Sequence, residues 1–184
     1  MPDEVVETPS FRGLEPGPEL VALPYRNDLR VRAFAVTHSV PSLGYTIFAH
    51  KRKLRAEYRE LPGPEIAKLR KSGIDVQIDV DDPVVTFIGD CVGASLIEEA
   101  HIWSSPILII EATFLEPGEE ALAAKKAHTH LADIAHALDR LGDTIRCEHI
   151  VLKHFSMKYR EDEVRALVGA GIPERFRDRI RILL

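Results

Sequence analysis

We predict an α/β fold for this 184-residue chain, with helices packed on a mostly buried sheet. Two short apolar runs, 83–90 and 105–114, open at or near a proline and are typical of strands buried on both faces. Segments with helical spacing lie between the predicted strands, and glycine ends each of them. The chain is 45% hydrophobic and 29% charged, which excludes a disordered tail, a collagen-like repeat and a disulfide-stapled miniprotein.

The elements follow in order along the chain. Residues 1–27 are rich in Pro, Gly and Glu, which predicts an N-terminal arm with one short strand near 20–23. Apolar runs and alternation predict six further strands, at 29–36, 43–50, 83–90, 105–114, 149–155 and 179–184. Proline or acidic residues at the start and glycine at the end predict three helices, at 62–73, 119–141 and 160–171.

The charge is distributed unevenly. A net charge of -5 and a pI near 5.9 argue at first sight against a nucleic-acid partner. Residues 51–71, however, hold eight Lys or Arg against three Glu, a net charge of +5, so the remainder carries -10. By charge alone, a solvated helix face of mixed charge explains this segment better than a binding surface does.

Three further features of the sequence bear on where in the cell the protein is found. No apolar run approaches the roughly eighteen residues that span a bilayer. The acidic N-terminus resembles neither a secretory signal nor an Arg-rich transit peptide. Cys91 and Cys147 lie far apart and form no metal-type pair. We therefore expect a cytoplasmic protein with no membrane partner.

Four predicted strands end at a residue that can bind metal or transfer protons. These residues are His38, Asp90, Glu111 and His154. Sites in α/β proteins usually lie at the C-terminal ends of strands, and His and Asp are natural zinc ligands. The alternative is that strands simply end at polar residues. The pattern alone leaves both explanations open, because no compact HxH or CxxC spacing accompanies it.

A histidine pair, His128 and His130, lies in the predicted long helix. A histidine beside a buried carboxylate is the arrangement that protonates a leaving group, and Glu111 is a candidate carboxylate. A solvated surface pair is the simpler interpretation of these two residues. Their sequence positions do not decide between the two.

Five segments in this order resemble successive motifs of tRNase Z (ribonuclease Z), a zinc-dependent endonuclease of the metallo-β-lactamase fold. They are 38–45 (HSVPSLGY), 87–90 (FIGD), 110–114 (IEATF), 128–131 (HTHL) and 154–159 (HFSMKY). The segment 52–76 also resembles the short plant and cyanobacterial members of the family. The resemblance implies that residues 28–184 form the C-terminal half of a metallo-β-lactamase αββα sandwich, with a basic arm inserted at 51–80.

The resemblance also implies site roles. His38 and His154 match zinc-ligand histidines, and Asp90 matches the aspartate that bridges two zinc ions. Glu111 and His128 match the pair in which the glutamate orients a proton-donating histidine. The expected reaction is cleavage of precursor tRNA after the discriminator base, by a metal-activated hydroxide.

One family motif is missing from this sequence. The His-x-His-x-Asp-His motif, which supplies most zinc ligands and positions the attacking water, does not occur. Three ligands cannot complete two metal positions. We therefore expect weak zinc binding and little or no nuclease activity from this chain alone. Without the N-terminal half of the sandwich, an apolar face or edge of the sheet would be uncovered. We therefore expect a homodimer or a complementing N-terminal half.

In the family, the segment corresponding to 51–80 grips the tRNA body. The residues that we expect to contact RNA in this way are Lys51, Arg52, Lys53, Arg55, Gly63, Pro64, Lys68, Arg70 and Lys71. Such phosphate contacts are independent of base sequence and sensitive to salt.

Two other functions are compatible with the sequence. The first is a non-catalytic RNA-binding or partner subunit that keeps the arm and lacks the metal centre. The second, which the arm disfavours, is another hydrolase of the same fold, acting on a different substrate.

Overall fold

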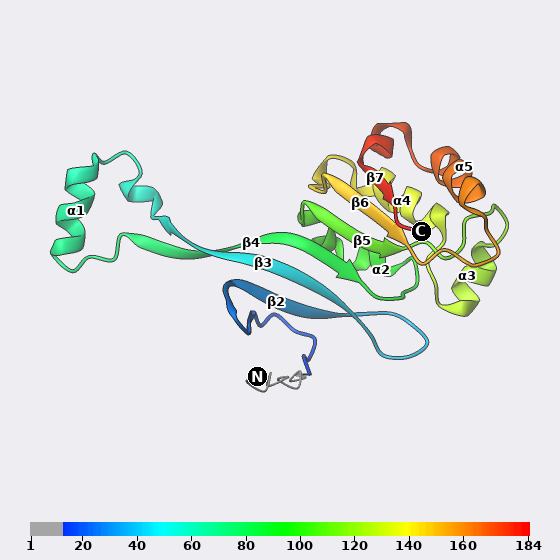
Figure 1. The fold of residues 1–184 in the computed structure, drawn as a ribbon, viewed down its shortest axis with the longest axis horizontal. Helices are drawn as coiled ribbons and strands as arrows, with labels where there is room; N and C mark the ends of the chain where they lie inside the picture. The colour runs from blue at the N-terminus through cyan, green and yellow to red at the C-terminus, as the bar shows by residue number, and fades with distance from the viewer. Residues whose placement is uncertain (1–12) are drawn as a thin grey trace, which may run out of the picture.

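Seven strands form one mixed sheet in the computed structural model, which describes residues 13–184 (Figure 1). Predictions for residues 1–12 lie outside this range. The strands are β1 (Val21–Leu23), β2 (Arg26–Val36), β3 (Ser42–Leu54), β4 (Gln77–Ile88), β5 (Ile107–Glu111), β6 (His149–Lys153) and β7 (Ile180–Ile182). The α-helices are α1 (Gly63–Lys71), α2 (Ser95–Glu98), α3 (Glu120–Lys126), α4 (Leu131–Leu141) and α5 (Glu161–Gly171). All predicted strands are present, although β2, β3 and β4 are longer than expected and β5, β6 and β7 are shorter.

The strands lie in the sheet in the order of the sequence, β1 to β7. The first four pair antiparallel, whereas β4, β5, β6 and β7 pair parallel. Helices connect the parallel strands because a parallel connection must cross from one end of the sheet to the other. Only the second half of the chain therefore has the predicted alternation of strands and helices.

One face of the sheet packs against the helices. Leu108 and Ile110 of β5 and Leu152 of β6 point to this face and are almost fully buried. They join one hydrophobic core with residues of α2, α4 and α5. Within residues 13–184, no helix is both long enough and apolar enough to cross a membrane.

The other face, which we call the open face, is formed by Tyr45, Ile47, Val85, Phe87, Ile109 and Val151. These residues are neighbours across the strands and are half-buried, except Phe87, whose exposed fraction is 39%. The prediction that 83–90 and 105–114 are buried on both faces is therefore wrong for β4 and holds only in part for β5, whose Ile109 is half-buried. Side chains alternate along a strand, and no helix of the core covers this face.

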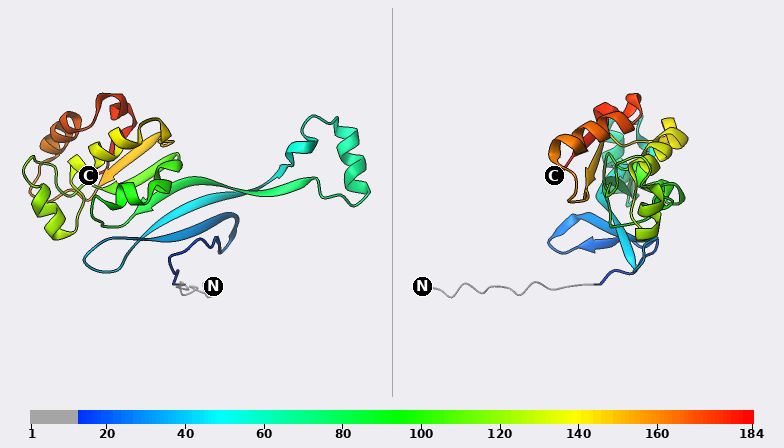
Figure 2. Two further views of the ribbon diagram at one scale, coloured as in Figure 1. Left: turned by 180° about the vertical axis from the view of Figure 1, so that it is seen from behind. Right: turned by 90° about the vertical axis from the view of Figure 1, so that its right-hand side faces the viewer.

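The distal parts of β3 and β4 form a long arm that projects from the sheet (Figures 1 and 2). Their antiparallel pairing continues as far as Leu54 opposite Gln77, and α1 lies at the tip. Pro64 stands in the first turn of α1, and Gly73, with φ of 84°, follows its end. The predicted insert at 51–80 corresponds to the outer arm and its tip.

The predicted helix at 119–141 is two helices, which corrects the sequence prediction. Ala127, with φ of 61°, ends α3 in the left-handed conformation, and its N–H bonds the carbonyl oxygens of Ala123 and Ala124. His130 then caps α4, because its side chain accepts a hydrogen bond from the N–H of Ala132. The break leaves a largely buried linker at 127–130, which brings His128 to the end of β5.

Candidate metal centre

The five predicted site residues meet at one edge of the sheet. His38 follows β2, Asp90 follows β4, Glu111 ends β5 and His154 follows β6. These strands run in the same direction, so their C-terminal ends lie together. The linker between α3 and α4 brings His128 to the same place. Ligand atoms of Asp90, Glu111, His128 and His154 all lie within 4.8 Å of one another.

Glu111 is the buried centre of this cluster. Its side chain is 0% exposed, and its carboxylate accepts hydrogen bonds from the backbone N–H of Cys91 at 2.9 Å and from the Thr113 hydroxyl. Nδ1 of His128 lies 3.0 Å from both carboxylate oxygens. An ionised carboxylate only accepts, so the proton of this contact is on Nδ1 and His128 presents Nε2 outward.

His154 and Asp90 lie beside this pair. Nδ1 of His154 is 3.2 Å from Oδ1 of Asp90 and 3.9 Å from Oε2 of Glu111. The backbone of His154 has φ of 59°, a left-handed conformation that costs a residue with a Cβ about 1–2 kcal/mol. Strain of this kind persists only where the surrounding structure holds it, and it is common at functional sites.

His38 completes the set from the far side of His128. The two imidazole rings meet edge to face with centroids 5.4 Å apart. Nε2 of His38 is buried and has no hydrogen-bond partner among residues 13–184. A buried imidazole nitrogen without a partner, on a ring that contacts His128 of the cluster, fits a metal ligand set.

Two site residues, both threonines, escaped the sequence analysis. Thr113 contacts Glu111 and His154, and the hydroxyl of Thr129 donates to the carbonyl oxygen of Cys91 at 2.9 Å. The Thr129 bond fastens the segment after β4 to the linker that carries His128, and the Thr113 contacts join the end of β5 to the segment after β6. Burial raises the pKa of the Cys91 thiol to about 11. Only the proximity of Thr113 to Glu111 in sequence could have indicated its role.

A second network joins the loop after β6 to the loop after β5. The Tyr159 hydroxyl donates to Glu119 at 2.6 Å and accepts from the N–H of Leu115 at 2.9 Å. Burial raises the pKa of Tyr159, whereas hydrogen bonds from Lys158 and Tyr159 lower the pKa of Glu119. The network fixes the two loops that carry Glu111 and His154 relative to each other.

The nine predicted RNA-contacting residues lie far from this cluster, on the arm (Figure 1). Lys51, Arg52 and Lys53 form ion pairs with aspartates of β4 or of the segment before it. Arg55 donates to backbone carbonyls, and Gly63 and Pro64 begin α1. Lys68, Arg70 and Lys71 occupy the last turn of α1 and take part in none of the ion pairs within residues 13–184.

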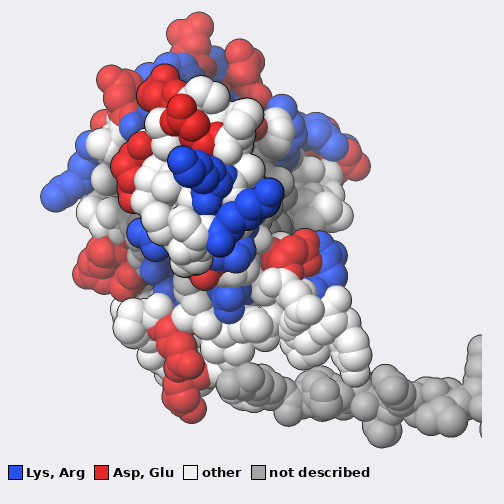
Figure 3. Space-filling view, turned by 90° about the vertical axis from the view of Figure 1, so that its left-hand side faces the viewer, with Lys and Arg blue, Asp and Glu red and all other residues white. Residues whose placement is uncertain are grey.

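The pairing changes the charge of the arm. Residues 72–82 contain four aspartates and no Lys or Arg, so residues 51–82 hold eight basic and seven acidic residues. Viewed from the arm side, the Lys and Arg side chains stand close to acidic ones (Figure 3). The unpaired positive charge is therefore concentrated at the tip rather than spread over the arm.

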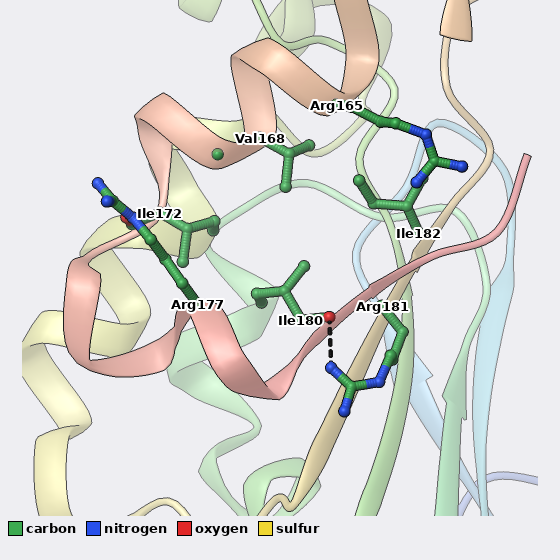
Figure 4. Close-up of a pocket in the computed structure, with 8 residues that line it drawn as sticks. Arg165, Val168, Ile172, Arg177, Ile180, Arg181 and Ile182 are labelled. Carbon is green, nitrogen blue, oxygen red and sulfur yellow. Dashed lines mark hydrogen bonds between the residues drawn. The ribbon is translucent and has the colours of Figure 1, made fainter. Parts of the chain in front are cut away.

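A separate pocket lies between α5 and β7 (Figure 4). Val168, Ile172 and Ile180 line it, and three arginines stand around it. One of these, Arg181, is bound to the carbonyl oxygen of Ile180 at 2.8 Å. None of the predicted site residues lines this pocket, so the candidate site is the cluster at the ends of β4, β5 and β6.

The fold is found among solved structures. A metallo-beta-lactamase fold protein from Bacillus subtilis superposes with a TM-score of 0.52 and 11% identity, over 90% of this chain and 49% of that chain. No family model matches the sequence. Together, the sheet with helices on one face and the His/Asp/Glu cluster at its edge define a chain of the metallo-β-lactamase fold class.

Within that class the chain is related in sequence to tRNase Z, also named ribonuclease Z. A chloroplastic tRNase Z of Arabidopsis thaliana is 34% identical over 146 residues, which are 78% of this chain and 40% of that protein. A second tRNase Z of the same plant is 32% identical over 164 residues, 88% of this chain and 56% of that protein. A zinc phosphodiesterase of Mus musculus is 31% identical over 153 residues, 71% of this chain and 40% of that protein. The chain thus spans about half the length of the curated relatives that it matches.

Proposed function

We propose that this chain forms the C-terminal half of a metal-dependent endonuclease of the tRNase Z type, which cleaves precursor tRNA at its 3′ end. The observation that carries the proposal is the convergence of Asp90, Glu111, His128 and His154 within 4.8 Å, in a chain related to tRNase Z. Phosphodiester cleavage of this kind needs a bound metal, an acid for the leaving oxygen and a surface that positions the RNA. The chain offers residues for each.

The metal ligands in this proposal are His38, Asp90 and His154, and the metal is zinc. Imidazole and carboxylate groups are common zinc ligands, and one relative is named a zinc phosphodiesterase. The unpartnered Nε2 of His38 supports its role as a ligand. When bound, such ions activate water and stabilise negative charge on the phosphate.

His128 supplies the proton in this proposal. Glu111 accepts the Nδ1 proton of His128, which holds the ring with Nε2 directed away from the buried carboxylate. A second proton on Nε2 makes an imidazolium, which the adjacent carboxylate stabilises and which donates to the departing 3′-oxygen. His128 therefore acts as the general acid, and Glu111 orients it.

The complete site takes the remaining ligands from a second polypeptide segment that covers the open face. Glu111 follows Ile109 by two residues on β5, so its side chain leaves the sheet on the side of the open face. A layer packed on Phe87 and its neighbours would thus lie next to the cluster. We propose that this layer is an N-terminal half with the His-x-His-x-Asp-His motif; a second copy of this chain would cover the face without adding those residues.

The arm binds the RNA in this proposal, and its tip makes the main phosphate contacts. Support comes from the three basic residues of α1 without ion pairs and from the length of the β3–β4 ladder. The same observation favours the second candidate function, a non-catalytic RNA-binding subunit. Cys91 and Cys147 are buried and unpaired, which suits a reducing compartment; both the cytoplasm and the plastid of the chloroplastic relative meet this condition.

The experiment compares the chain alone with the chain co-expressed with an N-terminal fragment of a relative that carries the motif. Zinc content after dialysis is measured by atomic absorption, and cleavage is measured on precursor tRNA. We expect little zinc and little cleavage from the chain alone, and both from the pair. Tight stoichiometric zinc with turnover by the chain alone would refute the half-site proposal. RNA binding by the pair without zinc or cleavage would favour the non-catalytic function.

A further inference from the structure

Thr113 lies where two parts of the cluster meet. Its hydroxyl donates to Oε2 of Glu111 and stands 3.0 Å from the backbone carbonyl oxygen of His154. The same oxygen is 3.3 Å from Nδ1 of His154 and 3.5 Å from Nδ1 of His128. A single side chain thus contacts the buried carboxylate and both histidines next to it.

Counting the available protons shows which of these contacts can be hydrogen bonds at the same time. A threonine hydroxyl has one proton to donate and two lone pairs that accept. The carboxylate of Glu111 is the stronger acceptor because it is charged, and the Nδ1 proton of His128 already belongs to that carboxylate. The lone pairs of Thr113 are consequently free to accept from Nδ1 of His154, at 3.3 Å, and share that N–H with Oδ1 of Asp90 at 3.2 Å. This contact would leave Nε2 of His154 as the nitrogen with a free lone pair.

The backbone around His154 depends on the same segment. The left-handed φ of His154 is 59°, and the residues on either side of it are fastened to the segment 111–113. The N–H of Ala112 donates to the carbonyl of Lys153 at 2.9 Å, and the N–H of Ser156 donates to the carbonyl of Thr113 at 3.0 Å. Within this segment the side chain of Thr113 makes the nearer contacts with His154, at 3.0 and 3.3 Å, whereas Oε2 of Glu111 is 3.9 Å from its Nδ1.

We propose that Thr113 is a positioning residue: its hydroxyl fixes the imidazole of His154 for metal binding and couples it to the Glu111–His128 pair. The metal-binding part of this inference rests on the proposed function. Thr113 itself is not proposed as a ligand. Residues that orient metal ligands in this way typically change metal affinity about 10–100-fold when they are removed.

Three variants test the proposal. Thr113→Val keeps the shape of the side chain and removes the hydroxyl, whereas Thr113→Ser keeps the hydroxyl. Thr144→Val is the matched control, because it also removes one hydroxyl bond, to the carbonyl of Leu141 at 2.8 Å, at an exposed helix end. Urea unfolding of each variant shows whether the fold is retained.

Metal binding is measured with Zn²⁺ by calorimetry and with Co²⁺ by its visible absorption, on the chain paired with the N-terminal fragment of a relative that carries the His-x-His-x-Asp-His motif. We expect Thr113→Val to weaken binding about tenfold or more and to alter the Co²⁺ spectrum. Thr113→Ser should bind within about threefold of the parent, and Thr144→Val should bind equally well. Unchanged affinity and spectrum in Thr113→Val would overturn the proposal.

A metal-free measurement separates this inference from the proposed function. Imidazole ¹⁵N spectra of the chain without metal report the environment of His154 directly. We expect its signals to move in Thr113→Val and to stay in place in Thr113→Ser. If the parent protein binds no metal, the proposed function fails, and these spectra still decide the role of Thr113. Identical His154 signals in all three proteins would overturn it.

Discussion

Replacing Glu111 by glutamine tests how the cluster sets the orientation of His128. Glutamine has the same shape, but its amide offers one acceptor oxygen and one donor nitrogen in place of two acceptor oxygens. The glutamine oxygen at the position of Oε1 can still accept from the N–H of Cys91. The amide nitrogen then stands at the position of Oε2, where the Thr113 hydroxyl must accept instead of donate. There the nitrogen also faces Nδ1 of His128, which in the parent lies 3.0 Å from both carboxylate oxygens. We expect His128 to move its proton from Nδ1 to Nε2.

The effect on stability is the difference of two opposing changes. Hydrogen bonds to a charged group contribute about 1.5–3 kcal/mol each and neutral ones about 0.5–1.5 kcal/mol, so three weakened bonds cost about 3 kcal/mol. Burying a neutral amide instead of a carboxylate returns a few kcal/mol, because Glu111 is fully buried. We therefore expect the free energy of unfolding of Glu111→Gln to remain within about 2 kcal/mol of the parent.

Cleavage should respond much more strongly than stability. A histidine locked in the wrong tautomer cannot act as a general acid paired with a carboxylate, so we expect cleavage to fall by about 10²- to 10⁴-fold. The measurements are urea unfolding, imidazole ¹⁵N spectra and precursor tRNA cleavage by the chain paired with its N-terminal half. Glu98→Gln, at an exposed position, is the control. An Nδ1 proton that persists on His128 in Glu111→Gln would refute the reasoning.

Three further predictions concern the arm, the core and the loops. Replacing Lys68, Arg70 and Lys71 together by alanine should reduce the slope of log binding constant against log salt concentration for tRNA by about 2–3. Replacing Lys51 and Lys53, which are ion-paired, by alanine should change this slope less, and an equal reduction would contradict a contact at the tip. Burial lowers the pKa of His101, so the unfolded chain binds more protons than the folded chain as the pH falls below the ordinary pKa of histidine, and the folded state loses stability. In His101→Gln the free energy of unfolding in urea should therefore change less between pH 7.5 and 5.5. An unchanged pH dependence would show that His101 does not contribute to it. Tyr159→Phe should lower the free energy of unfolding by about 1–3 kcal/mol, since the N–H of Leu115 loses its acceptor; an unchanged urea midpoint would show that water replaces the hydroxyl.

The sequence was sufficient for the strands and for the edge at which the site forms. Apolar runs locate β4, β5 and β6, and the polar residue after each run becomes a neighbour of the others once the strands are parallel. The roles assigned to these residues stay predictions. Their convergence agrees with the expectation from strand ends, whereas the metal and the reaction are not determined by that geometry.

Non-local contacts explain what the sequence did not reveal. The helical spacing from Leu122 to Leu141 continues through Ala127, so nothing local indicated the break. The bond of His128 to Glu111 and the cap by His130 override that local preference. In the same way, the basic segment appeared strongly charged because the aspartates that pair with it lie on the returning strand.

The charge pairing along β3 and β4 makes the arm a nearly neutral spacer with a basic end. A strand rises about 3.3 Å per residue, so the ladder sets how far the tip contact stands from the cluster that would cut the RNA. Two attachment points at a set separation select substrates by length as well as by charge. Lengthening the ladder by two residue pairs would move the tip by about 6.6 Å and keep every side chain on its face, whereas a single pair would exchange the faces of the outer arm. If the tip binds RNA, the length of the arm would therefore set the distance from that contact to the cluster, and this distance could change without exchanging the faces of the arm only in steps of two residue pairs.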